Sequence, residues 1–93
     1  MSQQATSRVT VPNRLGLHAR PAMEFVEKAS VYACSVSVRR TDGDEVVDGK
    51  SIMQMMLLAA TVGTELEIVC EGEDADEACS ALVSLVEGGF GEQ

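Results

Sequence analysis

The chain has 93 residues, of which 45% are hydrophobic and three are aromatic, and its formal net charge is −8. This length predicts a single domain, and the acidic charge with so few aromatic side chains argues against nucleic acid as a partner. The longest apolar run, residues 55–60, is too short to cross a bilayer, and the polar start does not resemble a secretory signal. We therefore expect a cytoplasmic protein without membrane insertion.

The first third of the chain predicts a strand followed by a helix. Residues 1–6 are expected to form a loose tail. A strand follows up to Val11, because apolar and polar residues alternate there with the two-residue period of a half-buried strand. From Pro21, apolar residues recur at helical spacing, which predicts a helix that ends near Ser30.

The middle third predicts a hairpin and a short helix. Residues 34–48 alternate on both sides of the turn signal Asp42-Gly43, which is typical of two antiparallel strands. A second helix is expected from about Ser51 to Ala60. Because apolar residues surround almost its whole circumference, some of its methionines should be exposed.

The last third predicts a fourth strand and a third helix. Apolar residues alternate with acidic ones from Leu66 to Cys70, and Asp74 with Glu77 forms a capping-box-like pair. Gly88-Gly89 is expected to end the helix. Its apolar stripe consists of Ala75, Ala78, Cys79, Leu82, Val83 and Val86.

The predicted order β-α-β-β-α-β-α indicates an α+β open-faced β-sandwich. A four-stranded antiparallel sheet with three helices on one face satisfies the apolar side of every element. The single domain spans residues 1–93, with an ordered core at about 7–87. Cys34, Cys70 and Cys79 are widely spaced and have no nearby histidine, so we expect buried thiols rather than a disulfide or metal site, and no cofactor.

The stretch Gly16-Leu17-His18-Ala19-Arg20-Pro21-Ala22 holds the only histidine. A neutral imidazole is a good phosphoryl acceptor near neutral pH, where a lysine would be protonated. At a helix start, the backbone N–H groups of Ala19 and Arg20 attract phosphate, and the Arg20 guanidinium can bind its oxygens. Pro21 is expected to keep Arg20 out of regular helix geometry. The alternative is a histidine with a structural hydrogen bond, and spacing alone does not decide between them.

The stretch Leu15-Gly16-Leu17-His18-Ala19-Arg20-Pro21-Ala22 closely resembles the active-site signature of the HPr family, the histidine-containing phosphocarriers of the phosphoenolpyruvate-dependent phosphotransferase system. Gly49-Lys50-Ser51-Ile52-Met53 resembles the second signature of that family. The resemblance implies that His18 takes a phosphoryl group on its Nδ1 atom from enzyme I and passes it to sugar-specific IIA-type proteins, with Arg20 binding the phosphate. The chain would then be a monomeric carrier and not an enzyme.

Ser51 stands where many HPr proteins carry a serine that an ATP-dependent HPr kinase/phosphorylase modifies. It also begins a Ser-x-x-Gln capping box with Gln54, which replaces a glycine common in this signature. Methionine side chains adapt to partners of different shape, which suits a carrier with several partners. Ordinary packing in the core is the alternative role for such residues in the second helix. The candidates for partner docking are Met53, Met56 and Leu57.

Two other interpretations stay open. One is a regulatory or nitrogen-branch carrier whose targets are not sugar permeases. The other is a protein-binding domain switched at Ser51, in which His18 is merely structural.

Overall fold

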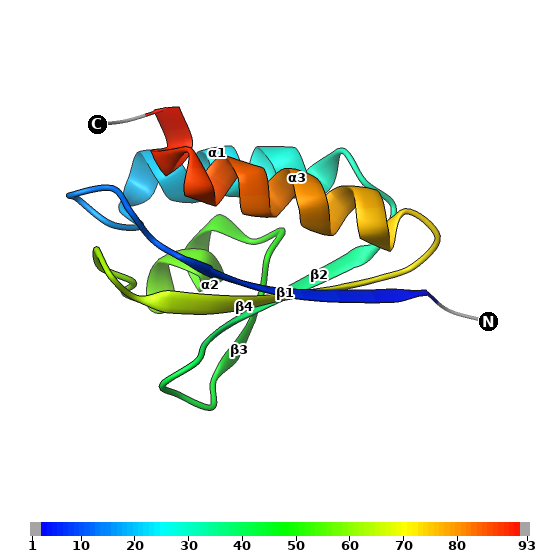
Figure 1. The fold of residues 1–93 in the computed structure, drawn as a ribbon, viewed down its shortest axis with the longest axis horizontal. Coiled ribbons are helices and arrows are strands. Elements are labelled where there is room, and N and C mark those ends of the chain that lie inside the picture. The colour runs from blue at the N-terminus through cyan, green and yellow to red at the C-terminus, as the bar shows by residue number, and fades with distance from the viewer. Residues whose placement is uncertain (1–2, 92–93) are drawn as a thin grey trace.

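The computed structural model describes residues 3–91, which form a four-stranded sheet with the helices packed on one face (Figure 1). The sheet is antiparallel throughout, and its strand order is β1-β4-β2-β3. The predicted open-faced sandwich is therefore confirmed. In chain order the elements are β1 (Gln4–Thr10), α1 (Ala19–Ser30), β2 (Ser35–Arg40), β3 (Val46–Asp48), α2 (Ile52–Leu57), β4 (Glu65–Glu71), α3 (Ala75–Glu87) and the 3-10 helix η1 (Gly89–Gly91).

The core lies between the sheet and the two long helices, with β4 beneath its centre. β4 pairs with β1 on one side and with β2 on the other, so its inward side chains are covered from every direction. Leu66, Ile68 and Cys70 are fully buried. The predicted stripe of α3 packs against this surface, with Val83 only partly buried at its edge.

Regular structure extends beyond the predicted core of 7–87 at both ends. β1 begins at Gln4, because Gln4 pairs with Glu71 and extends the β1–β4 ladder along the whole of β4. The expected tail is thus wrong from residue 4 onward, and residues 1–2 lie outside the described part. At the other end Gly89 has a φ of +68°, which turns the chain so that Phe90 packs into the core.

The second helix is shorter than predicted. α2 ends at Leu57 instead of Ala60. Ala59 has a left-handed φ of +50°, and a right-handed α-helix cannot continue through a residue in this conformation. The chain then turns through residues 58–64 into β4, and this connection lies against the loop that precedes α1. A left-handed residue just after a helix is a common C-terminal geometry, but glycine usually occupies it.

The three cysteines are buried and carry free thiols, as predicted. Burial, together with the neighbouring thiol of Cys79, raises the pKa of Cys70 to about 12. Within residues 3–91, no histidine, cysteine or carboxylate side chains gather in a group suited to a metal ion. None of the described helices has the length and apolar character that a membrane span requires.

Asp74 occupies the N-cap position of α3, but the predicted cap is wrong, because its side chain makes no capping hydrogen bond. Its carboxylate instead accepts hydrogen bonds from the backbone N–H groups of Ala33, at 2.8 Å, and Cys34, at 2.9 Å. These two residues connect α1 to β2. Asp74 therefore joins the start of α3 to a segment about 40 residues earlier in the chain.

This contact predicts a pH-dependent contribution to stability. The hydrogen bond from the Ala33 backbone lowers the pKa of the Asp74 carboxyl. A carboxyl with a lowered folded-state pKa stabilises the fold above its unfolded pKa of about 3.9, and this is lost as the pH falls through the folded-state pKa. We expect Asp74→Asn to unfold at a lower temperature than the wild type at pH 7, with the gap narrowing as the pH falls below about 3.9 and through the folded-state pKa.

Thermal unfolding followed by circular dichroism at pH 7 and at a pH well below about 3.9 measures the two gaps. Asp76→Asn is the matched control, because Asp76 is an exposed acid in the first turn of the same helix. A gap for Asp74→Asn that is equal at both pH values would contradict the role of its ionised carboxylate.

Candidate functional site

His18 is the N-cap residue of α1 and is partly exposed. Its backbone is extended, with φ −84° and ψ −170°, and its side chain makes no capping hydrogen bond. The first hydrogen bond of the helix runs from the Ala22 N–H to the His18 carbonyl oxygen, at 3.0 Å. The N–H groups of Ala19 and Arg20 therefore have no acceptor inside the helix, and Pro21 has no N–H. The imidazole is attached where two backbone donors and the positive end of the helix dipole meet.

Arg20 lies within the first turn of α1, so the prediction that Pro21 keeps it out of helix geometry is wrong. A proline in the first turn gives up no hydrogen bond, and burial of Pro21 and Ala22 against the core outweighs the extended preference of the preceding residue. The Arg20 side chain is 79% exposed, and its Nε atom lies 4.0 Å from Glu24 Oε1. Such an exposed pair is weak, so the guanidinium is available for a phosphate.

The loop before His18 is held against the connection that follows α2. The Leu17 N–H donates to the Ala60 carbonyl oxygen at 2.9 Å, and the Asn13 side-chain amide donates to the Gly16 carbonyl at 2.7 Å. Gly16 has a φ of +68°, a left-handed conformation that glycine adopts without steric cost. A Cβ atom there would also lie 2.5 Å from the Ala60 oxygen and 2.8 Å from Thr61 Cα. The need for this close approach was not visible in the sequence.

The second signature forms the junction between β3 and α2. Ser51 is the N-cap of α2, and its Oγ atom accepts from the Gln54 N–H at 3.3 Å, as predicted. The other half of the capping box is absent, because the Gln54 side-chain oxygen accepts from the Asp48 N–H, at 2.9 Å, instead of from Ser51. The Lys50 ammonium donates to the Tyr32 carbonyl just beyond α1, at 2.8 Å. These hydrogen bonds connect the start of α2 to β3 and to the segment just after α1.

The predicted docking residues of α2 are exposed, while Met55 is fully buried beneath them. Met53 is 80% exposed and Leu57 is 65% exposed, with Met56 less so. Other large apolar side chains are also exposed, and sequence reasoning did not single out Leu15 in the His18 loop or Met23 on α1 among them. The periodicity of α1 was the available signal for Met23, because this residue lies off the apolar face. The elements that carry these side chains are in contact, since α1 packs on α2.

Comparison with known proteins places this geometry in a family. Residues 5–88 match a family model described as "PTS HPr component phosphorylation site". The chain is 51% identical over 84 residues to the phosphocarrier protein HPr of Pseudomonas aeruginosa, covering 90% of this chain and 92% of the relative. It is 36% identical over 85 residues to the phosphocarrier protein NPr of Proteus mirabilis, covering 91% and 93%. The crystal structure of HPr-C-His from Thermoanaerobacter tengcongensis superposes with a TM-score of 0.88 at 38% identity, covering 96% and 98%.

Proposed function

Because this chain belongs to the HPr family of phosphocarrier proteins of the phosphotransferase system, we propose that His18 is its phosphoryl acceptor and enzyme I its donor. The observation that carries the proposal is the position of the only histidine at the N-cap of α1, beside two backbone N–H groups without helical acceptors. We propose that the chain acts in the cytoplasm as a carrier and not as an enzyme.

In the proposed transfer, the lone pair of the neutral His18 Nδ1 atom attacks the phosphorus of phosphorylated enzyme I. A P–N bond to His18 forms while the bond between phosphorus and the donor breaks, and the donor group keeps that electron pair. The added negative charge lies beside the Ala19 and Arg20 N–H groups, which stabilise it at the helix start. The Arg20 guanidinium leaves Glu24 and binds the phosphate oxygens. Attack by an acceptor nucleophile reverses these steps.

Incubation of the wild-type chain with phosphoenolpyruvate and enzyme I tests the proposal. We expect one phosphoryl group per chain, stable in alkali and lost in acid, as a phosphorus–nitrogen bond requires. Mass spectrometry before and after acid treatment measures both properties. Absence of the phosphoryl group, or a group that survives acid, would contradict the proposal.

IIA-type proteins are the proposed acceptors, and the docking surface is proposed to include Met53, Met56 and Leu57. Exposed methionines adapt to partners of different shape at low cost, which suits a carrier that binds a donor and then an acceptor. We propose that the chain works as a monomer, so that this surface stays open. A solved HPr from Thermoanaerobacter tengcongensis is a dimer, and light scattering of this chain decides between the two states.

Ser51 is proposed as a regulatory phosphorylation site for an HPr kinase/phosphorylase. Ser51 is partly buried and its hydroxyl caps α2, so its replacement by alanine should lower the free energy of unfolding by about 1 kcal/mol. We expect ATP and the kinase to phosphorylate the wild type and not Ser51→Ala, while enzyme I still phosphorylates both. Mass spectrometry after each reaction provides the measurement. Equal ATP-dependent modification of Ser51→Ala and the wild type would rule Ser51 out.

The sugar-transport branch is supported over a nitrogen branch by the higher identity to an HPr than to an NPr protein. The remaining alternative, a binding domain in which His18 is structural, gives a different result in the same assay. In that case phosphoenolpyruvate and enzyme I would leave His18 unmodified.

A further inference from the structure

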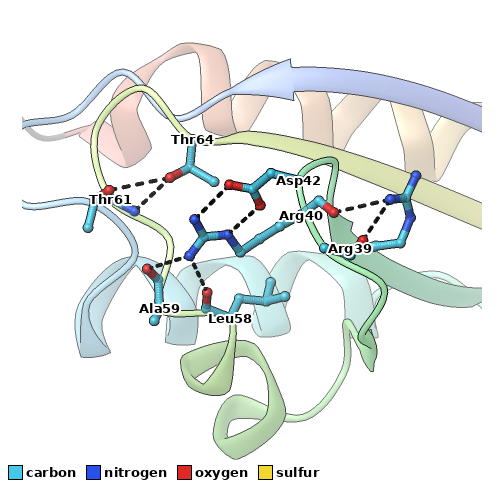
Figure 2. A network of polar contacts seen from close by, with 8 residues as sticks. Arg39, Arg40, Asp42, Leu58, Ala59, Thr61 and Thr64 are labelled. Atoms are coloured by element: carbon cyan, nitrogen blue, oxygen red, sulfur yellow. Dashed lines mark hydrogen bonds and ion pairs between the residues drawn. The ribbon is translucent and has the colours of Figure 1, made fainter.

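Arg40 lies at the end of β2, and its guanidinium donates hydrogen bonds to four oxygen atoms (Figure 2). Its Nε and Nη2 atoms donate to the two carboxylate oxygens of Asp42, each at 3.0 Å. Its Nη1 atom donates to the carbonyl oxygens of Leu58, at 3.1 Å, and Ala59, at 3.2 Å. The Asp42 carboxylate therefore fixes the plane of the guanidinium and aims the remaining donor at the chain just beyond α2.

These two carbonyls belong to a turn that needs support from outside. Carbonyl groups at the C-terminal end of a helix find no N–H donor within the helix. The carbonyls of Leu58 and Ala59 lie at this position, because α2 ends at Leu57. Ala59 is one of only two non-glycine residues with a positive φ in the described chain, and this geometry costs roughly 1–2 kcal/mol. A cation at the C-terminal end of a helix also interacts favourably with the negative end of the helix dipole. Arg40 supplies both the donors and the charge.

The next residue connects this turn to the phosphorylation site. The Ala60 carbonyl accepts the N–H of Leu17, at 2.9 Å, and both residues are almost fully buried. Leu17 directly precedes His18 in the chain. One side of the connection at 58–64 thus faces Arg40, and the other supports the backbone that carries the imidazole.

We infer that Arg40 is a positioning residue for phosphoryl transfer: by fixing the turn after α2, it fixes the Ala60 carbonyl that holds the backbone beside His18. The inference rests on the proposed function of His18 for its kinetic consequence. Its structural part, the link from Arg40 to the Leu17 N–H, stands independently of that function.

Arg39 provides a matched control for a purely structural role. It is the neighbouring residue of the same strand and also makes several hydrogen bonds. Its guanidinium donates to the carbonyls of Arg40, at 3.2 Å, and Gly43, at 2.9 Å, and to the Glu67 carboxylate, at 3.0 Å. None of these partners lies in the connection at 58–64. Arg39→Met and Arg40→Met therefore remove the same charge from the same strand, but only Arg40→Met releases the turn.

Two measurements at a temperature where both variants are folded test the inference. Hydrogen exchange of the Leu17 amide reports on its bond to Ala60, and kcat and KM with enzyme I report on transfer. For Arg40→Met we expect Leu17 exchange to be faster by about tenfold and kcat to fall by about tenfold, with a smaller change in KM. Arg39→Met should leave both close to wild type. Arg40→Lys should restore part of each, because an ammonium group can still donate to the carbonyls.

Unchanged Leu17 exchange in Arg40→Met would overturn the inference, and so would equal effects of Arg39→Met and Arg40→Met. If Arg40→Met does not fold, Arg40→Lys carries the same comparison against Arg39→Lys. A wild-type chain that accepts no phosphoryl group would refute the proposed function instead, while the exchange of the Leu17 amide would still test the structural link.

Discussion

Replacing His18 by alanine is expected to abolish phosphoryl acceptance from enzyme I, because it removes the only imidazole of the chain. The nearby groups can bind a phosphate but cannot take one covalently, since an arginine and backbone N–H groups offer no free lone pair near neutral pH. The extended backbone of residue 18 suits alanine, so circular dichroism should show a folded variant. Mass spectrometry after incubation with phosphoenolpyruvate and enzyme I should detect no phosphoryl group. Normal phosphorylation of His18→Ala would refute the assignment.

Arg20→Ala gives the informative comparison, because it keeps the proposed nucleophile His18 and removes a proposed hydrogen-bond donor to the phosphate. We expect acceptance to continue but to slow by about a hundredfold, the usual effect of losing one preorganised donor. Arg14→Ala is the control, since Arg14 is exposed in the same loop and carries the same charge. Similar slowing in both variants would indicate general attraction to the donor protein instead of phosphate binding by Arg20.

Replacing Gly16 by alanine is expected to lower the free energy of unfolding by roughly 2–4 kcal/mol. Two costs combine at this position. The φ of +68° is strained for any residue with a Cβ atom, and that atom would lie 2.5 Å from the Ala60 oxygen. Because the Ala60 oxygen accepts from Leu17, relief of the collision must move the backbone next to His18. Urea unfolding measures the loss, and phosphoryl acceptance by the folded variant should also be slower.

Gly63→Ala separates the two costs. Gly63 also has a positive φ, +90°, but nothing lies within 4 Å of the place where its Cβ atom would be. Its replacement should therefore show the backbone cost alone, about 1–2 kcal/mol. Equal losses of stability in Gly16→Ala and Gly63→Ala would mean that the loop absorbs the collision, and the close approach would then not position His18.

Local periodicity was enough to place most elements of this fold. The alternation at 66–70 and the stripe of α3 follow from which side of each element is buried, and neighbouring residues carry that information. The exposed methionines of α2 were predictable for the same reason, since so short a helix cannot bury its whole circumference. Element ends were less accurate. β1 begins earlier because of its pairing with Glu71, and α1 begins at Ala19 because burial overrides the preference before Pro21.

Partners distant in the chain were not predictable. Asp74 has the sequence of a helix cap, but its carboxylate binds Ala33, which is 41 residues away. The Arg40 guanidinium binds Leu58, which is 18 residues away, and Arg40 has no distinguishing pattern around it. A side chain with several possible acceptors chooses among them by which backbone groups the fold leaves without partners.

By itself, the sequence determined the layer architecture and singled out His18, because burial patterns and a rare side chain at a helix start are local properties. Only the tertiary structure decided how His18 is held. The contact between Leu17 and Ala60, the space that Gly16 leaves for it and the hold of Arg40 on the turn after α2 join segments that no local pattern relates. Such contacts form because buried polar backbone groups need partners, and the packed fold alone determines which partners are within reach.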